Sequence, residues 1–363
     1  MHRCDDRGDT VYKILVLNPG STSTKVAVFE DEKKILQETV SHDANELAQC
    51  DTLMEQEPMR RKAIVDFLKR HNLSPEMFSA IGARGGVLPP VPSGTYLVNE
   101  DMVNYLKHEA PVEHASNLAA VIGYELGGRG SIPCYVTNPV SVDEMWNSAR
   151  FSGIPEIERK SYSHALNIKA VARKVAKELG KEYEECKMVV VHLGGGISVS
   201  AHLYGRMVDV NNANDEGPFS SERAGELPVG DLLKIAFSGK YTKRELKRRY
   251  VGQGGLVAYL GTNDLRKAME MARTDDKAAL IVEAMAYQIS KEIGGMAAVL
   301  GGDLDAIVIT GGMAHSSDFV QKITRRVSRF GLVTVVPGEF EMEALALGAL
   351  RVLRGEEKAK LFR

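Results

Sequence analysis

The sequence predicts an α/β protein built from two similar halves, on three observations. Residues 14–29 have the sequence ILVLNPGSTSTKVAVF, in which two apolar runs flank a turn rich in hydroxyl groups, as in a β-hairpin. KMVVVHLGGG and ISVSAHLYGRMVDV repeat the order strand, glycine turn, strand at an offset of 174 residues (187 − 13). Segments with helical spacing lie between the two hairpins. A duplicated domain explains this pattern, and chance similarity of two hairpins is the alternative.

The expected elements follow one another as in an alternating α/β chain. Strands are expected at 13–17 and 25–29. Helices are expected at 114–126 and 164–180, because apolar residues recur every three or four positions and the second segment ends on glycine. After the second hairpin, a long apolar helix at 281–302 leads into LDAIVITGGMAH, a strand that ends in a Gly-Gly turn.

Composition indicates a small-molecule partner. A chain of 363 residues, 44% of them hydrophobic, can bury one large core, and two domains are the better expectation. Lys and Arg number 46 against 48 Asp and Glu, for a formal net charge of −2. This balance predicts no binding of nucleic acid and no binding to an anionic membrane.

Cysteine usage and the N-terminus predict a soluble, cytoplasmic protein. Cys4, Cys50, Cys134 and Cys186 stand singly, without a CxxC pair, as expected for reduced thiols rather than a disulfide framework or a zinc site. The first residues, MHRCDDRGDTVYK, are polar where a signal peptide needs an apolar core. The longer apolar segments are broken by glycine or charge.

Three turns combine glycine with polar side chains beside apolar strands, at 18–25, 192–198 and 310–314. Backbone N–H groups of such a turn can face a phosphate, and glycine leaves the approach open. The ends of strands are also where α/β sheets bind ligands. For any single turn, a tight connection without a ligand is the alternative. The patterns GxxxxGK[ST] and GxGxxG do not occur at these positions, which argues against P-loop and Rossmann proteins.

These turns carry a resemblance to the acetate kinase family. VLNPGSTSTK resembles the first signature of that family, and VVVHLGGGIS and DVNNANDEGPFSSERAGELP resemble its second phosphate loop and its arginine segment. The butyrate kinase branch is the more similar one. RGGVLPPVPSGTYLV, EHASNLAA, NPVSVDEM, SHALNIKAVAR, GGLVAYLGT and EALALGALRVLRGEE resemble its segments in the same order, over nearly the whole chain.

The resemblance implies a duplicated actin-like (ribonuclease H-like) fold, shared with sugar kinases and heat-shock protein 70, with ATP in a cleft between two domains. Domain I would comprise residues 1–150 and the C-terminal helix 341–363, and domain II residues 151–340. The γ-phosphoryl group of ATP would pass in line and reversibly to a short-chain fatty acid such as butyrate or isobutyrate, giving an acyl phosphate and ADP. Mg²⁺ and a homo-oligomer are further implications.

Two residues would stabilise the transferring phosphoryl group. By resemblance, Arg223 in SSERAG contacts this group, and His164 in SHALN stabilises the transition state. A carboxylate is already an oxyanion nucleophile, so these residues are needed to offset charge repulsion rather than to remove a proton. A surface ion pair with Glu222 or Glu226 is the alternative for Arg223, and purely structural bonds are the alternative for His164.

Two substrate positions depart from the acetate kinase pattern. Arg84 stands where acetate kinases carry a histidine, and Ile81 occupies the place of their substrate arginine; we expect Arg84 to hold the substrate carboxylate instead. Glu113 occupies the place of their second active-site histidine, with His114 beside it. Either residue would line the cleft, and capping of the following helix is the alternative for Glu113.

The same resemblance assigns the three turns to ATP or ADP. The first would contact the phosphates and the catalytic centre, the second would be the β-phosphate loop, and the third would neighbour the nucleoside. These residues are Asn18, Ser21, Ser23 and Lys25; then His192, Gly194, Gly195 and Gly196; then Gly311 and Gly312.

The expected Mg²⁺ site also departs from the family. Glu341 falls where the family carries its metal-linked glutamate, although Phe340 replaces a flanking asparagine. Asn138 stands in place of the second carboxylate, an aspartate before proline. Mg²⁺ keeps most of its waters and needs one or two carboxylates. Because asparagine adds no negative charge, binding would be weaker unless Asp143 turns inward.

The chain length of the substrate acid is the most detailed of these expectations. One methylene in an apolar pocket changes the binding free energy by only about 1–3 kcal/mol. Ser163, which stands where Phe is usual, suggests a roomier or more polar acyl pocket. The alternatives to a butyrate kinase are an acetate or propionate kinase, and an ATP-binding regulator of the same fold that has lost turnover.

Overall fold

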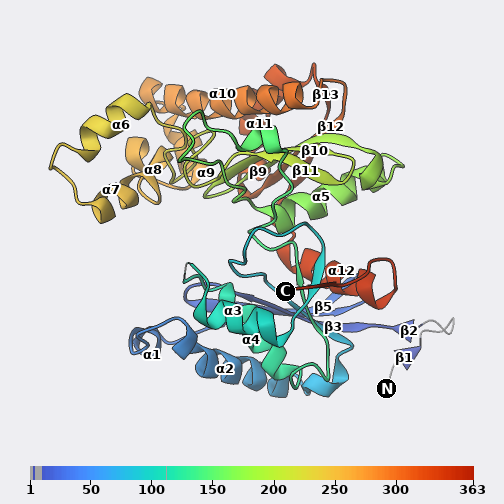
Figure 1. Ribbon diagram of the computed structural model, residues 1–363. Helices are drawn as coiled ribbons and strands as arrows, with labels where there is room; N and C mark the ends of the chain where they lie inside the picture. Colours follow the sequence, from blue (N-terminus) through green and yellow to red (C-terminus); the bar gives the residue numbers. More distant parts are fainter. Residues whose placement is uncertain (1–2, 5–9, 112) are drawn as a thin grey trace. The chain divides into compact units, whose positions relative to one another are not determined.

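Two mixed β-sheets organise the chain, one in each of two units (Figure 1). The computed structural model describes residues 3–4, 10–111 and 113–363. Unit 1 comprises Met1–Val142 and Phe340–Arg363, and unit 2 comprises Asp143–Glu339. Among the described residues, no helix combines the length and the apolar character needed to span a bilayer.

Unit 1 contains a seven-stranded sheet of order β14-β7-β8-β6-β3-β4-β5. In chain order, its strands are β3 (Lys13–Pro19), β4 (Ser23–Glu30), β5 (Lys33–Ser41), β6 (Ala80–Ala83), β7 (Thr95–Leu97), β8 (Cys134–Thr137) and β14 (Lys360–Leu361). A separate small sheet pairs β1 (Arg3–Cys4) with β2 (Thr10–Val11). The helices are α1 (Ala44–Ala48), α2 (Glu57–Arg70), α3 (Glu100–His108), α4 (Asn117–Leu126) and α12 (Glu341–Leu353).

Unit 2 contains a five-stranded sheet of order β11-β10-β9-β12-β13. Its strands are β9 (Lys187–Leu193), β10 (Ile197–Leu203), β11 (Arg206–Val210), β12 (Leu304–Gly311) and β13 (Gly331–Pro337). Its helices are α5 (Ala165–Glu178), α6 (Val229–Ala236), α7 (Lys243–Tyr250), α8 (Gly255–Leu260), α9 (Leu265–Met271), α10 (Asp276–Val299) and α11 (Ser317–Val327).

The two sheets share one topology. In each, an antiparallel meander of three strands, β3-β4-β5 or β9-β10-β11, is extended by two parallel strands, β6 and β8 or β12 and β13. The first strand begins at Lys13 in unit 1 and at Lys187 in unit 2, which is the offset found in the sequence. The repeat is therefore a property of the fold and not a coincidence of two hairpins.

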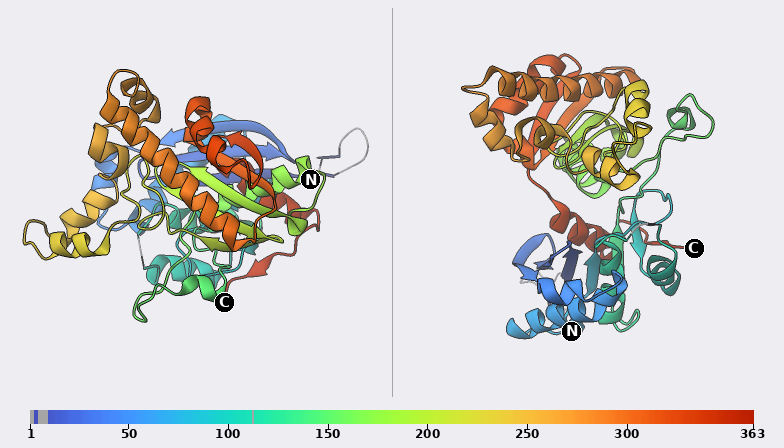
Figure 2. Two further views of the ribbon diagram at one scale, coloured as in Figure 1. Left: turned by 90° about the horizontal axis from the view of Figure 1, so that it is seen from above. Right: turned by 90° about the vertical axis from the view of Figure 1, so that its left-hand side faces the viewer.

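Helices cover both faces of the sheet in unit 2. The long helix α10, orange in the figures, runs across the strands on one face, and α5 lies on the other (Figures 1 and 2). Side chains alternate along β9, so Val189, Val191 and Leu193 are buried in one core with Ile289 and Ile293 of α10. The residues between them, His192 included, face α5.

In unit 1, α12 covers one sheet face while α2 and α4 lie on the other (Figure 1). Close packing of α12 depends on two glycines. A Cβ at Gly82 of β6 would stand 2.9 Å from the carbonyl oxygen of Leu345, and one at Gly348 would collide with the Thr137 side chain. This packing fixes the N-terminal residue of α12, Glu341, at the sheet.

The first hairpin turn is tighter than the sequence predicts. Because β3 continues to Pro19 and β4 begins at Ser23, only residues 20–22 lie between the strands. The Gly20 N–H donates to the carbonyl of Ser23 at 2.7 Å and closes the turn. Asn18 and Lys25 are direct cross-strand partners, so their side chains emerge on the same face of the sheet.

Other boundaries differ by a few residues. The helix expected at 114–126 begins at Asn117, and the helix expected at 281–302 spans Asp276–Val299. The second helix starts earlier because the side chain of Asp275 accepts hydrogen bonds from two N–H groups of its first turn. Cys50, Cys134 and Cys186 are free thiols, while the side chain of Cys4 lies outside the described part of the chain.

Candidate active site

In unit 1, three of the predicted residues meet where β3 and β6 end. Asn18 lies near the end of β3, Arg84 follows β6, and Glu341 begins α12. The Asn18 Nδ2 donates to Glu341 Oε2 at 2.8 Å, and Arg84 forms an ion pair with the same carboxylate. The N-terminus of α12 favours a carboxylate there, because its backbone N–H groups carry partial positive charge. The arrangement places a cation, an amide and a carboxylate side by side.

The hydroxyl-rich turn rests on a buried arginine that the sequence analysis missed. Arg60 of α2 is fully buried and donates to the carbonyls of Gly20 at 2.8 Å and Ser21 at 2.7 Å. Burial lowers the pKa of its guanidinium. Since these two carbonyls are drawn toward Arg60, the exposed side of the turn presents other polar groups. Ser21 and Lys25 are exposed there, and Ser23 is half-buried.

Glu113 is not a helix cap. Its Oε1 accepts a hydrogen bond from the Leu53 N–H at 3.3 Å, and the N-cap position of α4 belongs to Ser116. The capping alternative for Glu113 is therefore wrong, because the helix starts later than expected. Its neighbour His114 instead pairs its Nδ1 with the Ser116 hydroxyl at 2.7 Å.

Asn138 has a backbone role of its own. Its φ of 41° lies in the left-handed region, which asparagine tolerates better than most residues. Its Oδ1 accepts from the Gly94 N–H at 2.8 Å, and its own N–H donates to the Gly94 carbonyl at 3.0 Å. This pairing accounts for a small polar side chain at position 138.

Asp143 is engaged by an arginine. Both carboxylate oxygens accept from Arg150, at 2.6 and 2.8 Å, within unit 2. In the described part of the chain, no group of three or more His, Cys, Asp and Glu residues is arranged to hold a metal ion. Of the three expected metal residues, Glu341 has the carboxylate beside the catalytic candidates Asn18 and Arg84. A single carboxylate fits an ion that takes its other ligands from water and phosphates.

In unit 2, the two predicted histidines stack on each other. His164 is the N-cap residue of α5 and His192 lies in β9; their ring centroids are 4.0 Å apart, with an interplanar angle of 13°. The His164 Nδ1 pairs with the Ser198 hydroxyl at 2.9 Å, and the His192 Nδ1 pairs with the Asn167 Nδ2 at 2.9 Å. Both rings therefore take part in structural hydrogen bonds through their Nδ1 atoms.

The glycine loop after β9 is packed against charged side chains. A Cβ at Gly195 would stand 3.0 Å from Glu222 Oε1, and one at Gly196 would overlap the guanidinium of Arg223. Arg223 donates from Nη1 to the Ala213 carbonyl at 2.8 Å. Burial lowers the pKa of its guanidinium, and Glu222 opposes that shift. Arg223 is thus held inside unit 2 against the loop.

The third turn begins where glycine is required. Gly311 has a φ of 93°, and a Cβ there would strike the backbone of Leu193. Its N–H donates to the Gly338 carbonyl at 3.1 Å, and the Gly338 N–H donates back at 3.0 Å. Gly312, the next residue, is exposed and lines a cavity together with Gly194. The second and third turns therefore border one space.

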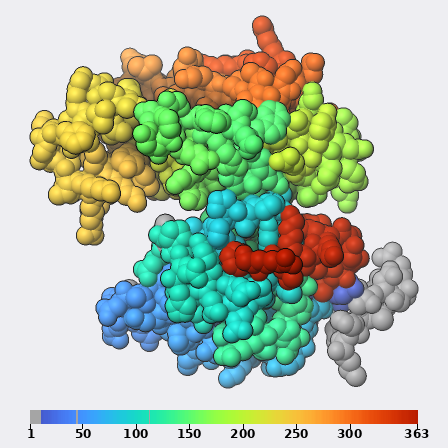
Figure 3. Space-filling view, viewed as in Figure 1, coloured from blue at the N-terminus to red at the C-terminus, as the bar shows by residue number. Residues whose placement is uncertain are grey.

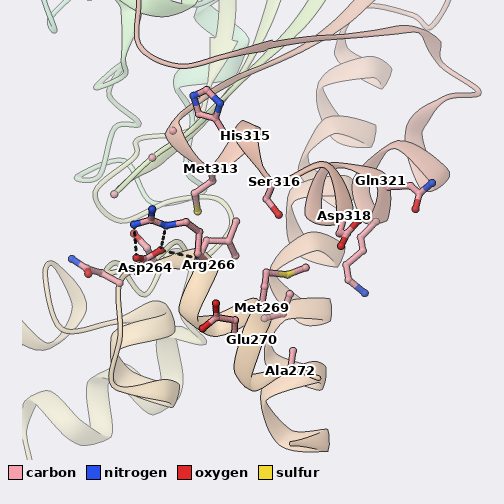
Figure 4. Close-up of a pocket in the computed structure, with 18 of the residues that line it drawn as sticks. Asp264, Arg266, Met269, Glu270, Ala272, Met313, His315, Ser316, Asp318 and Gln321 are labelled. Carbon is pink, nitrogen blue, oxygen red and sulfur yellow. Dashed lines mark hydrogen bonds and ion pairs between the residues drawn. The ribbon is translucent and has the colours of Figure 1, made fainter. Parts of the chain in front are cut away.

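That cavity has a volume of about 1290 Å³ and lies within unit 2 (Figure 4). Besides the glycines, it is lined by α9, by the 3-10 turn Gly312–His315 and by α11. Apart from Met313, which lies in the third turn, the sequence analysis did not single out these lining residues, because none of them stands in a recognisable short motif. They include Asp264, Arg266, Met269, Glu270, Met313, His315, Ser316, Asp318 and Gln321.

Asp264 and Arg266 form an ion pair at the cavity wall. The carboxylate caps α9, accepting from the Arg266 N–H at 2.9 Å, and the guanidinium donates to it at 2.8 Å. These hydrogen bonds lower the pKa of the Asp264 carboxyl to about 2. The sulfur-containing side chains Met269 and Met313 add apolar surface to the same space (Figure 4). The wall thus offers both charge and an apolar contact.

Comparisons with known proteins place the chain in a family. The model of the acetokinase family matches residues 156–337. Over 353 residues, the chain is 65% identical to a protein named probable butyrate kinase from Thermotoga petrophila, covering 97% of this chain and 99% of that one. A protein named probable butyrate kinase 1 from Thermotoga maritima matches with the same identity and coverage.

A solved structure shows the same fold. The crystal structure of Porphyromonas gingivalis acetate kinase superposes with a TM-score of 0.79 at 19% identity, covering 94% of this chain and 100% of that one. The predicted fold class, a duplicated actin-like α/β fold, is confirmed.

Proposed function

Because the chain belongs to the acetokinase family and is a carboxylate kinase, we propose that it phosphorylates butyrate or a branched relative such as isobutyrate. ATP, the phosphoryl donor used in this family, would give ADP and the acyl phosphate, and the reaction would run in both directions. The observation that carries the choice of acid is the 65% identity, over nearly the whole chain, to proteins named as probable butyrate kinases.

The chemistry needs charge stabilisation more than proton transfer. The acid is ionised at neutral pH and attacks phosphorus directly, so an anion must approach an anion. We assign Arg223 and His164 to the transferring phosphoryl group. Arg223 suits this role because it is half-buried, and a fixed positive charge acts more strongly there than in water. His164 suits it because its Nδ1 is already oriented by Ser198.

In unit 1, we assign Arg84 to the acid. Arg84 already binds a carboxylate, that of Glu341, which is chemically like the group of the substrate. Of the two residues expected near the acid, Glu113 has less support than Arg84, because its carboxylate accepts a hydrogen bond from the backbone N–H of Leu53. Asn18, Ser21, Ser23 and Lys25 would contact phosphate oxygens from the first hairpin.

We assign the nucleotide to the unit 2 cavity. The β-phosphate would lie at the loop formed by His192 and the glycines 194–196. The nucleoside would lie beyond Gly312, between α9 and α11. The volume of about 1290 Å³ and the apolar contacts of Met269 and Met313 support this placement.

Mg²⁺ would be held by Glu341 together with phosphate oxygens and water. When bound, the ion neutralises charge on the phosphates. Asn138 retains its bond to Gly94 and would reach the ion only through water. Asp143 would contribute only if it exchanged its partner Arg150.

We also expect a homo-oligomer in the cytoplasm. Free thiols at three cysteines suit a reducing compartment. Exposed apolar side chains of α6, Val229 and Leu233 among them, are a candidate contact between copies. Helix α6 belongs to the yellow part of the surface of unit 2 in Figure 3. Sedimentation velocity over a range of concentrations tests this expectation, and a monomer at all concentrations would contradict it.

A hydroxylamine trap tests the proposed reaction. Purified protein and Mg·ATP are incubated with acetate, propionate, butyrate, isobutyrate or valerate, and the acyl hydroxamate is measured by colour. We expect the highest kcat/KM for butyrate or isobutyrate, and ATP formation from butyryl phosphate and ADP. A higher value for acetate or propionate would overturn the choice of acid. His164→Ala should lose at least about a hundredfold in kcat, while His108→Ala, at an exposed residue of α3, should not.

A further inference from the structure

The two stacked histidines of unit 2 have chemically different partners. A serine hydroxyl contacts the Nδ1 of His164 at 2.9 Å, and an asparagine side chain contacts the Nδ1 of His192 at the same distance. A hydroxyl group can donate or accept. The NH₂ group of an amide can only donate. The protonation of the two rings is therefore constrained to different degrees.

A chain of hydrogen bonds matches the orientation of the Asn167 amide in this structure, with its NH₂ group toward His192. The Gly338 carbonyl can only accept, and it accepts from the Thr310 hydroxyl at 3.2 Å. The Thr310 oxygen is then available as an acceptor, and the Asn167 Nδ2 donates to it at 3.4 Å. The same NH₂ group lies 2.9 Å from the His192 Nδ1. In this orientation the His192 Nδ1 accepts from the amide and carries no proton.

The proton of His192 must then be on Nε2. This atom points toward the glycine loop, because a Cβ at Gly194 would stand 2.9 Å from it. In contrast, Ser198 can turn its hydroxyl to accept from a protonated Nδ1 of His164. His164 can therefore take up a second proton and His192 cannot, unless Asn167 moves.

We propose that Asn167 is a positioning residue that holds His192 as a neutral Nε2–H donor and confines any positive charge of the stacked pair to His164. The proposal deepens the function above and rests on it for one point, the donation of Nε2–H to a nucleotide phosphate. Two charged rings with centroids 4.0 Å apart would repel each other. Keeping one ring neutral leaves the other free to stabilise negative charge on the transferring group.

The surroundings of His192 are consistent with a neutral ring. The neighbouring strands place Ser198 and Thr310 opposite it, and both side chains are uncharged. His164, at the start of α5, is a titratable group that faces the ring directly. Glu222 and Arg223 lie farther along the loop, against Gly195 and Gly196.

Nitrogen-15 NMR of nucleotide-free protein, labelled in its histidines, tests the proposal. Signals are assigned with His192→Asn and His164→Asn. We expect the His192 Nδ1 to show the shift of an unprotonated nitrogen, unchanged across about pH 5–8, the range in which ordinary histidines titrate. We expect His164 to titrate. A proton on His192 Nδ1 in the native protein would overturn the proposal, whether or not any variant folds.

The substitution Asn167→Asp replaces the hydrogen-bond donor that faces the His192 Nδ1 with an acceptor. A carboxylate accepts from Nδ1–H and therefore favours the charged ring. We expect the His192 titration to move upward by about one pH unit or more, and activity to fall on the acidic side of the profile. An unchanged His192 titration in the folded variant would refute the role of Asn167. The matched control is Ser200→Ala. It removes the hydroxyl that pairs with the Nε2 of the buried His202 at 2.8 Å, and it should leave the His192 signals in place.

The NMR result and the activity result are separable. If the protein phosphorylated none of the acids but His192 carried its proton on Nε2, the proposed function would fail and the tautomer would stand. If the enzyme were active but His192 titrated freely, the reverse would hold.

Discussion

Gly196→Ala should reduce turnover by displacing Arg223. The backbone of Gly196 is not in the left-handed region, so alanine is acceptable to the main chain. The new methyl carbon would, however, lie 2.8 Å from Arg223 Cζ, well inside van der Waals contact. Because Nη1 is also tied to the Ala213 carbonyl, the guanidinium can retreat only by giving up that bond. Loss of one preorganised donor to the transition state costs about 10² to 10³ in kcat, or roughly 2.7–4 kcal/mol.

The assay is initial-rate kinetics with butyrate, coupled to ADP release, alongside circular dichroism of the same preparation. We expect kcat to fall about a hundredfold or more, with a smaller change in the KM for butyrate. Gly295→Ala is the matched control: it lies in α10 with open space around its Cβ position, and alanine is the better helix former by about 1 kcal/mol. A folded Gly196→Ala enzyme that kept its kcat within about twofold would refute this role of Arg223.

Three further predictions concern a buried ion pair, a buried histidine and the metal site. Lys169→Met should lower the free energy of unfolding by about 3–5 kcal/mol, because it leaves Glu144, 2.7 Å from the Lys169 Nζ in the native protein, without its charge partner; thermal melting measures this. Burial, together with the charge of Arg60, lowers the pKa of His42 to about 4. As the pH falls, the unfolded chain therefore takes up a proton at this histidine before the folded protein does, and the stability that His42 contributes is lost between about pH 6.5 and pH 4. Urea titrations at a series of pH values measure this loss. Asn138→Asp should lower the Mg²⁺ concentration needed for half-maximal rate, because it adds a carboxylate where one oxygen can still accept from Gly94.

Each of the three has its own contrary outcome, and the first two have a comparison variant. Lys177→Met, at an exposed position of the same helix as Lys169, should change stability by less than about 0.5 kcal/mol, and equal effects of the two would contradict the buried-pair argument. His42→Gln should flatten the pH dependence, and an unaltered slope would reject His42 as its source. Unchanged or weaker use of Mg²⁺ by Asn138→Asp would reject the metal assignment.

The sequence by itself determined the local elements and their repetition. Hairpins at 13–29 and 187–203 could be predicted because alternation and glycine turns depend on neighbouring residues only. The family signatures also lie in short segments, so His164, His192 and Arg223 could be nominated before any contact was known. The length of the first turn was misjudged, because strand pairing with β5 extends β4 back to Ser23.

The tertiary structure alone decided which of these residues touch, and what holds them. Asn18 meets Glu341 across 323 positions of sequence, and Asn167 meets Thr310 across 143, because parallel strands and the helices on a sheet bring distant segments to one edge. Arg60 could not be recognised beforehand, since a basic residue of an amphipathic helix ordinarily faces solvent, and only the packing of α2 buries it beneath the first turn. The residue types that carry the chemistry can be recognised in short segments of the sequence. Their partners, their burial and their protonation depend on the whole fold.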